Sequence, residues 1–379
     1  MKKLKTYVNR FEGVVTQKRN LKHIYSFKNF PVFMGCVKSQ AKNDLVADMD
    51  WGIDPETGVI QLTKLVPLKI LYQEQHVDGC SPTWQKYYKD FARYIKKQKV
   101  KSVLEIGGGQ GKLAELVIEN TPSIKWTIVE PNPTVKNKKI HVVSKFFDSG
   151  FKTREKFDTI VFSQLLEHVY SPGNFLKAIH NFLEERGLLI FAYPNLEKWL
   201  RNKFTNAINF EHTFFLTDYY LDYLLKKNGF SIVSKKYYGD HSIFYTAKKS
   251  DNKNEPALPA SKYRLYKKIF LNFINYHKNM IRGLNLKISK SPYPTYLFGA
   301  HIFSQFLFAF GLKSKKIRNI LDNSPLKQNK RLYGTNLIVK SPQILKGMGK
   351  VNVILKAGIY NAEIKKDILE NINSSVGFW

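Results

Sequence analysis

Apolar positions between residues 100 and 249 fall into short runs that alternate with helical patterns. Five of these runs have the length and composition of buried strands, and they cover residues 100–106, 125–130, 140–146, 157–163 and 187–193. Helical segments separate the runs, and crossover connections of this kind join parallel strands. Residues 230–249 predict two further strands that meet at a turn near Gly239. The pattern therefore predicts an α/β core with a mostly parallel seven-stranded sheet.

Residues typical of helix ends frame two helices of this region. Ser171 can cap a helix, Pro172 suits its first turn, and Gly187 suits its end. Between these positions, apolar residues recur at the spacing of one buried helix face. Thr217 can cap a second helix that ends near Gly229. Both helices are expected to cover the sheet.

The chain outside this core has a different composition on each side. Before the core, short strand-like pieces alternate with Asp, Pro and Gly turns, and a helix is expected over 82–97. After the core, a polar stretch with Pro256 and Pro259 predicts a linker, which a basic amphipathic helix and a second α/β unit follow. The expected division is an N-terminal substrate-binding or lid region 1–95, a core domain 96–250, a linker 251–262 and a C-terminal α/β domain 263–379.

The net charge of +31 is the extreme property of this composition. A field of that sign attracts anions, which include nucleic acid, an anionic membrane surface or a phosphorylated small substrate. The lysines are spread along the chain and are not gathered in one tail, so the charge alone selects none of these partners. The basic helix expected after the linker is the one hint of peripheral contact with an anionic membrane.

Cysteine usage and hydropathy indicate a cytoplasmic protein. The two cysteines, Cys36 and Cys80, cannot form a structural zinc site by themselves and form no disulfide framework. No apolar run reaches the length of about 18 residues that a bilayer span requires. The first residues carry lysines but no apolar segment of a secretory signal. We expect reduced thiols, and the sequence predicts no metal site.

A glycine-rich turn between a predicted strand and a predicted helix carries the first chemical signal. It reads Glu105-Ile-Gly-Gly-Gly-Gln-Gly111, and its glycines let the backbone approach a ligand closely. The helix that follows offers free N–H groups in its first turn. Glu130 ends the next predicted strand, where a carboxylate can accept hydrogen bonds from both hydroxyls of a ribose. Dinucleotide-binding folds use a similar turn, so a domain that binds another nucleotide is the alternative.

These residues resemble the class I methyltransferases, which have a Rossmann-like core and use S-adenosylmethionine. The resemblance covers the glycine turn, Glu130 and the fourth predicted strand with the residues that follow it. It implies that the turn wraps the methionine part of the cofactor and that the residues after the strands contact its ribose, adenine and methionine parts. The implied cofactor-binding residues are Glu105, Gly107, Gly108, Gly109, Gly111, Glu130, Pro131, Phe147, Asp148, Ser163 and Gln164.

Two passages outside the core resemble the three-part sugar C-methyltransferases, which act on nucleotide-linked keto-sugars. Asn209-Phe-Glu-His212 is similar to the substrate segment of that family, and Gly299-Ala-His301 with Asp322 to Lys327 is similar to its C-terminal Rossmann-like domain. The chain departs from the family in three ways. It lacks the cysteines of the N-terminal zinc module, and it has Asn209 in place of a tyrosine and Phe210 in place of a histidine.

The reaction needs a base that removes a proton from the methyl acceptor. Histidine titrates near neutrality, so His212 is the first choice, with Glu211 as its orienting or second acid–base group and His168 as the next choice. The expected substrate contacts are His76, Tyr87, Asn209 and Lys327. Lys327, with Lys330 and Arg331, can neutralise a phosphate of the substrate. For Tyr87 and its neighbour Tyr88, packing in the core is the preferred explanation.

The sequence thus predicts a methyltransferase for a nucleotide-activated sugar, as in the synthesis of a surface polysaccharide, and leaves carbon and oxygen acceptors open. Methylation of RNA is an alternative that the charge suggests. No RNA-binding module accompanies the charge, however, and Ser163-Gln-Leu-Leu166 replaces the Asn/Asp-Pro-Pro-aromatic segment typical of enzymes that methylate base amino groups. We therefore expect no nucleic-acid partner. A binding or scaffold protein without turnover is the remaining alternative.

Overall fold

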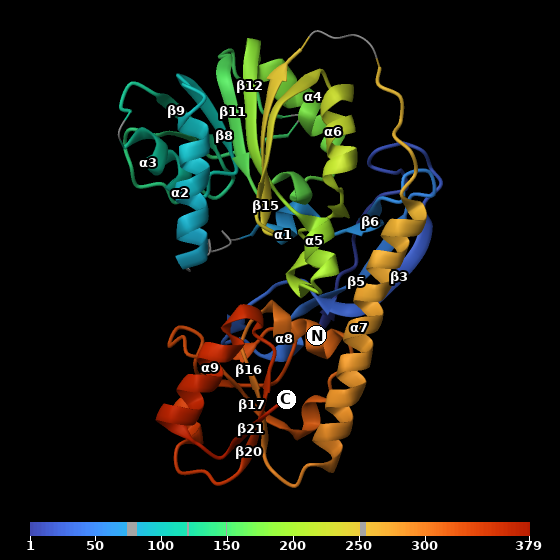
Figure 1. Ribbon diagram of the computed structural model, residues 1–379, viewed down its shortest axis with the longest axis vertical. Helices are drawn as coiled ribbons and strands as arrows, with labels where there is room; N and C mark the ends of the chain where they lie inside the picture. The colour runs from blue at the N-terminus through green and yellow to red at the C-terminus, as the bar shows by residue number, and fades with distance from the viewer. Residues whose placement is uncertain (74–81, 120, 149, 251–254) are drawn as a thin grey trace.

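The computed structural model describes residues 1–73, 82–119, 121–148, 150–250 and 255–379. Two α/β units lie at opposite ends of the molecule, and strands of the N-terminal segment lie between them (Figure 1). A long helix, α7 (Tyr263–Lys290), runs along one side from the first unit to the second. Among the described helices, none combines the length and the apolar composition that a bilayer span would need.

Seven strands form the sheet of the first unit, in the order β10-β9-β8-β11-β12-β15-β14. The first five run parallel, whereas β15 pairs antiparallel with both β12 and β14. The predicted mostly parallel sheet is therefore confirmed. Its strands are β8 (Ser102–Ile106), β9 (Lys125–Val129), β10 (His141–Val143), β11 (Phe157–Ser163), β12 (Leu183–Pro194), β14 (Phe230–Tyr238) and β15 (Ser242–Lys249).

Helices cover both faces of this sheet, as the apolar periodicity predicted. One face carries α2 and α3, whose buried side chains form one cluster with the strands. On the other face, α4 and α6 join a larger core that continues into the N-terminal strands. The helices of the unit are α2 (Pro82–Lys96), α3 (Lys112–Ile118), α4 (Pro172–Phe182), α5 (Leu196–Arg201) and α6 (Asp218–Lys227).

The predicted end of α4 at Gly187 is wrong. The helix ends at Phe182, and Gly187 lies inside β12, at an irregularity where the register with β11 shifts. A β-carbon at Gly187 would meet the backbone oxygens of Glu184 at 2.9 Å and of Asp158 at 3.1 Å. The glycine therefore permits a close backbone approach in a bulged strand and does not cap the helix.

The N-terminal segment (residues 1–73) forms a sheet that takes its last strand, β13, from the first α/β unit. Five strands make up this sheet: β1 (Lys2–Lys3), β3 (Lys22–Pro31), β5 (Leu45–Ile53), β6 (Ile60–Leu62) and β13 (Phe214–Phe215). The shorter elements of the segment are β2 (Val8–Asn9), β4 (Cys36–Val37), β7 (Lys64–Leu65) and α1 (Leu68–Leu71). Because β13 follows directly after His212, the segment is built into the region that carries the candidate catalytic residues.

A buried arginine ties this segment to the same region. Arg10 donates hydrogen bonds to the backbone oxygens of Tyr170 at 2.6 Å, Thr213 at 2.8 Å and Leu62 at 3.3 Å. Burial lowers the pKa of Arg10 to about 10, so the guanidinium stays charged at neutral pH. Hydrogen bonds from a charged donor are stronger than neutral ones. The N-terminal segment therefore fixes the backbone next to His168 and next to His212.

The C-terminal unit is a five-stranded parallel sheet in the order β19-β17-β16-β20-β21. The strand that comes first in the sequence lies at the centre, which is the arrangement of a Rossmann-like unit, and the prediction of such a unit is confirmed. Helix α7 is longer than expected and ends at Lys290 instead of residue 280. The other elements are β16 (Thr295–Phe298), α8 (Ile302–Ala309), β17 (Ile317–Leu321), β18 (Arg331–Leu332), β19 (Val339–Lys340), β20 (Val351–Leu355), α9 (Asn361–Asp367) and β21 (Val376–Phe378). The division into domains at residues 95, 250 and 262 stays a prediction.

Candidate active site

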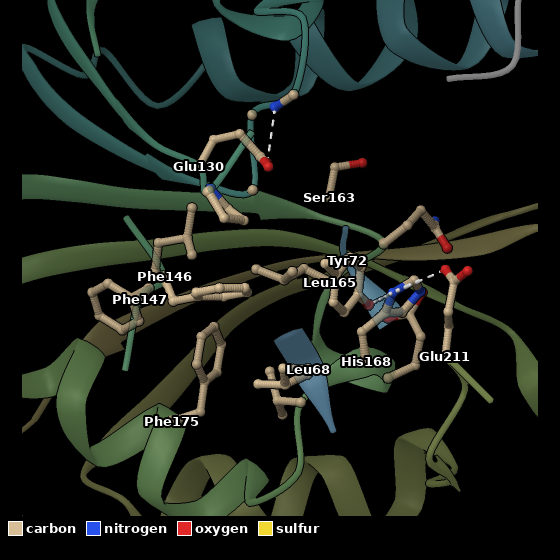
Figure 2. Close-up of a pocket in the computed structure, with 18 of the residues that line it drawn as sticks. Leu68, Tyr72, Glu130, Phe146, Phe147, Ser163, Leu165, His168, Phe175 and Glu211 are labelled. Atoms are coloured by element: carbon tan, nitrogen blue, oxygen red, sulfur yellow. Dashed lines mark hydrogen bonds and ion pairs between the residues drawn. The ribbon is translucent and has the colours of Figure 1, made fainter. Parts of the chain in front are cut away.

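A cavity of about 950 Å³ opens where β8, β9 and β11 reach their carboxyl ends (Figure 2). Residues that follow these strands line one part of it, and residues of the N-terminal segment and of the 199–212 region line another. His301 and Ile302 enter from the C-terminal unit. Ligands of open α/β sheets bind in this crevice, and the volume lies near the upper end of the range for ligand pockets. The size suits a cofactor together with an acceptor.

The glycine turn after β8 forms the wall of the cavity that sequence analysis assigned to the cofactor. Gly107, Gly109 and Gly111 have positive φ angles of 76°, 50° and 77°, which glycine adopts without strain. A β-carbon on Gly107 would lie 3.2 Å from Leu165, and one on Gly108 would lie within 3 Å of Ile128. The turn therefore packs so closely that side chains would either strain it or fill the space beside it.

Two carboxylates hold the turn and the end of the next strand. Glu105 is buried, and its Oε2 accepts a hydrogen bond of 2.8 Å from the indole of Trp126. Glu130 follows β9, and its two oxygens accept hydrogen bonds from the backbone N–H groups of Gly109 at 3.3 Å and Asn132 at 3.1 Å. Glu130 points into the cavity in Figure 2. A carboxylate fixed in this way can accept hydrogen bonds from hydroxyl groups of a ligand in the cavity.

Aromatic side chains close the end of the cavity beyond Glu130. Phe147 lies against Phe175 with ring centroids 5.6 Å apart, and both rings line the cavity with Pro131 (Figure 2). Asp148 also lines it, and its Oδ1 accepts a hydrogen bond from the N–H of Gly150. The three sequence-predicted residues of this end, Pro131, Phe147 and Asp148, thus line one slot, whose flat apolar walls suit an adenine ring.

Ser163 and Gln164 line the cavity between the glycine turn and the acceptor end. Gln164 has a positive φ of 51°, an uncommon conformation for a non-glycine residue that turns the chain sharply after β11. Its amide donates to Ser242 at 2.8 Å and to the hydroxyl of Tyr87 at 3.2 Å. The hydroxyl groups of Tyr87 and Ser163 are 2.6 Å apart. Both residues are therefore held in place by the α2 and β15 regions.

The acceptor end brings together the three candidate catalytic residues. Nδ1 of His168 lies 3.6 Å from a carboxylate oxygen of Glu211 and 2.9 Å from the hydroxyl of Tyr72 (Figure 2). His212 lies beside them, with its ring centroid 5.2 Å from that of His168. Its Nδ1 is 3.1 Å from the backbone oxygen of Ala207. Burial lowers the pKa of His212 to about 4, so this imidazole is neutral at pH 7.

Asn209 organises the backbone of this region. Its Oδ1 accepts hydrogen bonds of 2.7 Å from the N–H groups of both Glu211 and His212, and its Nδ2 donates to the oxygen of Asn206. This geometry is an Asx-type turn, which fixes the direction of the two side chains that follow. Asn209 also lines the cavity. Asn209 therefore has a structural role besides any contact with substrate.

Two of the expected substrate contacts, Tyr87 and Lys327, are not among the described residues that line the cavity. Tyr87 is fully buried in the core between the sheet and α2 and does not line the cavity, so packing explains it; its neighbours Trp84 and Tyr88 line the cavity instead. Lys327 lies away from the cavity lining, and its Nζ pairs with Asp322 at 3.0 Å. His76 lies outside the described residues.

Arg331 was expected to meet a phosphate of the substrate, and the structure contradicts this expectation. Its guanidinium is buried and forms two contacts of 2.5 Å with the carboxylate of Asp44, which lies in the N-terminal segment. A buried arginine that is already paired in this way has no donor surface left for a ligand.

Sequence analysis missed two residues of the acceptor end. Glu167 is almost completely buried, and burial raises the pKa of this carboxyl to about 8. The signal for it was a charged residue between Leu166 and His168, directly after a buried strand. Tyr72 had no local signal, because it belongs to a distant part of the chain that only the fold brings near.

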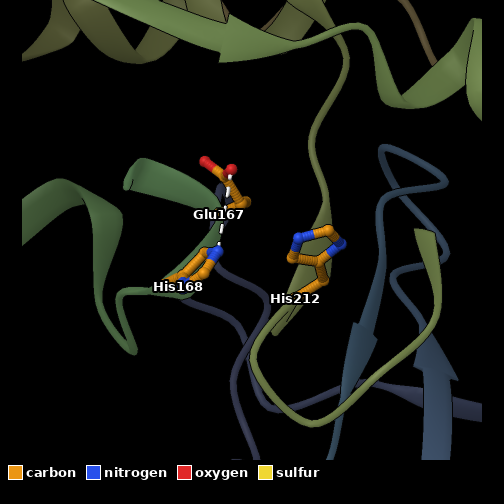
Figure 3. A group of neighbouring side chains, drawn as sticks. All are labelled: Glu167, His168 and His212. Atoms are coloured by element: carbon orange, nitrogen blue, oxygen red, sulfur yellow. Dashed lines mark ion pairs between the residues drawn. The ribbon is translucent and has the colours of Figure 1, made fainter. Parts of the chain in front are cut away.

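Glu167, His168 and His212 form a group whose potential metal-ligating atoms lie within 4.8 Å of one another (Figure 3). Oε1 of Glu167 is 3.8 Å from Nε2 of His168. One carboxylate and two imidazoles are a ligand set that proteins use for divalent transition metals. This grouping could not be predicted from the sequence, because His212 is far from the other two residues along the chain.

Residues 81–235 match the model of a family described as a methyltransferase domain. No curated protein matches the chain. Among solved structures, an O-methyltransferase family protein from Burkholderia thailandensis is 12% identical, with a TM-score of 0.39 over 45% of this chain and 57% of that chain. The N-methyltransferase NodS from Bradyrhizobium japonicum is 16% identical, with a TM-score of 0.35 over 45% of this chain and 99% of that chain.

A third solved structure is a 1,6-didemethyltoxoflavin N1-methyltransferase from Burkholderia thailandensis with S-adenosylhomocysteine bound. It is 18% identical, with a TM-score of 0.37 over 45% of this chain and 82% of that chain. The family match covers most of the seven-stranded sheet and all of the glycine turn described above. Residues 81–235 therefore form a methyltransferase domain, which uses S-adenosylmethionine as its methyl donor.

Proposed function

We propose that the enzyme transfers a methyl group to a nucleotide-activated sugar in the cytoplasm, for the synthesis of a surface polysaccharide or a related carbohydrate. The observation that carries the proposal is the position of His168. Its imidazole lies at the acceptor end of the cofactor cavity, between the carboxylate of Glu211 at 3.6 Å and the hydroxyl of Tyr72 at 2.9 Å. A base held in this way can take a proton from a hydroxyl group or from a carbon beside a carbonyl group.

The surroundings of the two histidines favour His168 over His212 as the base. Glu211 can stabilise the imidazolium that forms when His168 takes up a proton. His212 is more deeply buried, and its pKa of about 4 makes it a weak base at neutral pH. Transfer then needs the acceptor atom to be aligned with the methyl group of the sulfonium, which the shared cavity provides. The proposed base is therefore His168, with Glu211 as its stabilising partner.

The lining of the acceptor end supports a sugar. Trp84, Tyr88 and Trp199 offer apolar ring faces, and Asn206 and Asn209 offer amide groups. Flat apolar walls suit the C–H surface of a sugar ring, and amide groups can donate to and accept from its hydroxyls. The resemblance of the 209–212 and 299–301 segments to sugar methyltransferases points in the same direction.

The distribution of charge supports an exit for the nucleotide toward the C-terminal unit. Among the described residues that line the cavity, the lysines are Lys112 and Lys177, and both belong to helices at the cofactor end. His301 enters the lining from the C-terminal unit, where Lys327 follows β17. Lys327 could neutralise a diphosphate there, provided that its ammonium leaves or shares its contact with Asp322.

Calorimetric titration with S-adenosylhomocysteine tests the cofactor part of the proposal. We expect micromolar binding to the purified protein and at least tenfold weaker binding to Glu130→Ala, because the carboxylate that accepts the ribose hydroxyls is lost. Glu119→Ala removes an exposed carboxylate at the end of α3 and should leave the affinity unchanged. No binding to the folded wild-type protein would contradict the proposal.

A panel of nucleotide sugars tests the acceptor part. Release of S-adenosylhomocysteine is measured with keto-sugar and hydroxyl-bearing nucleotide sugars, and the product is located by mass spectrometry. His168→Gln should lower kcat by about 10²-fold or more while the affinity for the cofactor product stays the same. If RNA accepts methyl groups and no nucleotide sugar does, the sugar assignment is wrong.

A further inference from the structure

The acceptor end contains two imidazoles and one carboxylate that converge from two segments of the chain. Glu167 and His168 follow β11, whereas His212 precedes β13. Oε1 of Glu167 lies 3.8 Å from Nε2 of His168, and potential ligand atoms of all three side chains lie within 4.8 Å of one another (Figure 3). Glu167 and His212 are both buried, and the cavity reaches all three residues.

The hydrogen bonds of His212 leave its Nε2 available as a ligand. Its Nδ1 is 3.1 Å from the backbone oxygen of Ala207, which can only accept a hydrogen bond. The proton of the neutral ring is therefore on Nδ1, and Nε2 carries the lone pair. A histidine that ligates a metal usually donates its other ring N–H to a backbone oxygen or a carboxylate in this manner.

His168 also directs its Nε2 toward the group. Its Nδ1 faces the carboxylate of Glu211 at 3.6 Å and the hydroxyl of Tyr72, while its Nε2 faces Glu167. A proton on Nδ1 is stabilised by the carboxylate, and this tautomer leaves the lone pair of Nε2 directed at the group. Both histidines thus offer Nε2, and Glu211 is an outer partner of the kind that orients metal ligands.

A buried carboxylate oxygen of Glu167 without a hydrogen-bond partner among the described residues is an independent observation that favours a bound ligand. The side chain is 1% exposed, and its Oε2 finds no hydrogen-bond partner within the described part of the chain. A buried carboxylate oxygen without a partner costs free energy, so such atoms are rare in folded proteins unless a ligand or a proton satisfies them. A cation next to the two imidazoles that binds both oxygens of this carboxylate would satisfy Oε2.

We infer that Glu167, His168 and His212 bind a divalent first-row transition-metal ion at the acceptor end of the cavity. Two nitrogen ligands favour such an ion over Mg²⁺ or Ca²⁺, which prefer oxygen ligands. Three protein ligands leave at least one position open to the cavity, as in catalytic metal sites. The binding of the ion stands by itself, whereas its role rests on the proposed function.

In that role, the ion takes an oxygen of the acceptor as a further ligand. A metal ion lowers the pKa of a bound hydroxyl group or stabilises an enolate oxygen. With His168 engaged as a metal ligand, Glu211 would replace His168 as the base of the proposed function and take the proton of the acceptor. The deprotonated acceptor oxygen, or the α-carbon of the enolate, then forms a bond to the methyl carbon. At the same time the bond between the methyl carbon and the sulfonium sulfur breaks. The products are the methylated sugar and S-adenosylhomocysteine.

Titration of the metal-free protein with Co²⁺ alone tests the inference, with uptake followed by calorimetry and by the visible absorption of the ion. We expect one Co²⁺ per chain for the wild type. Glu167→Gln and His168→Gln should each raise the dissociation constant at least tenfold. His23→Gln, which alters an exposed histidine of β3, should leave it unchanged. Binding of S-adenosylhomocysteine by each variant reports that the domain is folded.

The outcomes separate the metal site from the proposed function. A wild-type protein that binds S-adenosylhomocysteine but takes up no stoichiometric Co²⁺ overturns the metal site, and a proton then satisfies Glu167. Equal Co²⁺ affinity of the wild type, Glu167→Gln and His168→Gln also overturns it. Uptake of Co²⁺ that depends on these residues, in a protein that methylates no sugar, would support the metal site and contradict the proposed function.

Discussion

The hydroxyl oxygen of Tyr72 lies 2.9 Å from Nδ1 of His168, although 96 positions separate the two residues. Tyr72 directly follows α1 in the N-terminal segment. His168 lies after β11, in the loop beyond the end of that strand. The contact exists because Arg10 and strand β13 hold the two regions together. The N-terminal segment is thus a component of the acceptor site.

Removal of this hydroxyl should impair turnover and leave the cofactor site intact. We expect Tyr72→Phe to lower kcat about tenfold, because the loss of one orienting hydrogen bond corresponds to roughly 1–1.5 kcal/mol. Steady-state kinetics with the sugar that the panel identifies would measure the effect. The affinity for S-adenosylhomocysteine serves as the control, and a variant with unchanged kcat would show that the hydroxyl does not orient the base.

The buried pair of Asp44 and Arg331 should be the strongest polar link between the N-terminal segment and the C-terminal unit. The two side chains meet through two contacts of 2.5 Å, and Asp44 also accepts a hydrogen bond from the N–H of Gly334. Asp44→Asn leaves a buried guanidinium without its counter-charge, so we expect a loss of about 3–5 kcal/mol in the free energy of unfolding.

Urea denaturation measures this loss, and an exposed ion pair provides the comparison. Glu12 and Arg19 are 3.1 Å apart at the surface. Glu12→Gln should change the free energy of unfolding by less than about 1 kcal/mol, because water screens the pair. Similar losses in the free energy of unfolding for the two substitutions would mean that the buried pair stabilises the protein no more than the exposed pair.

Gly58 should tolerate no side chain. Its φ is +85°, and a β-carbon there would lie 2.5 Å from the Cα of Tyr263 at the start of α7. Gly58→Ala combines backbone strain with a clash against backbone atoms, so we expect a destabilisation of about 2–4 kcal/mol or an insoluble product. Thermal unfolding monitored by circular dichroism would report the change.

Gly173 offers the opposite case within the same protein. It lies in helix α4, and nothing within 4 Å would meet its β-carbon. Gly173→Ala should therefore raise the free energy of unfolding by about 0.5–1 kcal/mol, because alanine has the higher helix propensity. A destabilised Gly173→Ala together with a stable Gly58→Ala would contradict the packing described here.

His277 should make the stability of the protein fall in weak acid. Its Nε2 is 3.1 Å from the backbone oxygen of Lys203, and its Nδ1 is buried without a hydrogen-bond partner in the described part of the chain. Burial lowers the pKa of this imidazole to about 4, compared with about 6.5 in the unfolded chain. The unfolded chain therefore binds a proton first, and stability is lost as the pH falls from about 6.5 toward 4.

The variant His277→Phe should have a flatter pH dependence. The phenyl ring can keep the stacking on Phe310, whose ring centroid lies 5.0 Å from that of His277. Between pH 7.5 and 5, the wild type should lose about 1–2 kcal/mol more free energy of unfolding than the variant. Urea denaturation at both pH values measures the difference. Equal losses would mean that His277 does not titrate in this range.

The sequence determined the elements whose signals are local. Apolar runs, helix periodicity and the glycine turn led to the seven-stranded sheet, the Rossmann-like C-terminal unit and the cofactor wall with Glu130. These features could be predicted because strand burial, helix faces and turn conformations each depend on residues that are neighbours in the chain. Gly187 was misread since a glycine that permits a bulge and a glycine that ends a helix have the same local signature.

The tertiary structure decided which side chains meet at the acceptor end. Tyr72, Glu167, His168, Glu211 and His212 come from three segments, and their order along the chain does not reveal that they share one cavity. The same is true of Arg331. Its sequence context predicted a contact with a phosphate of the substrate, whereas the fold pairs it with Asp44. The burial of Glu167 and the low pKa of His212 likewise depend on groups distant in sequence, because desolvation is a property of the packed structure and not of the neighbouring residues.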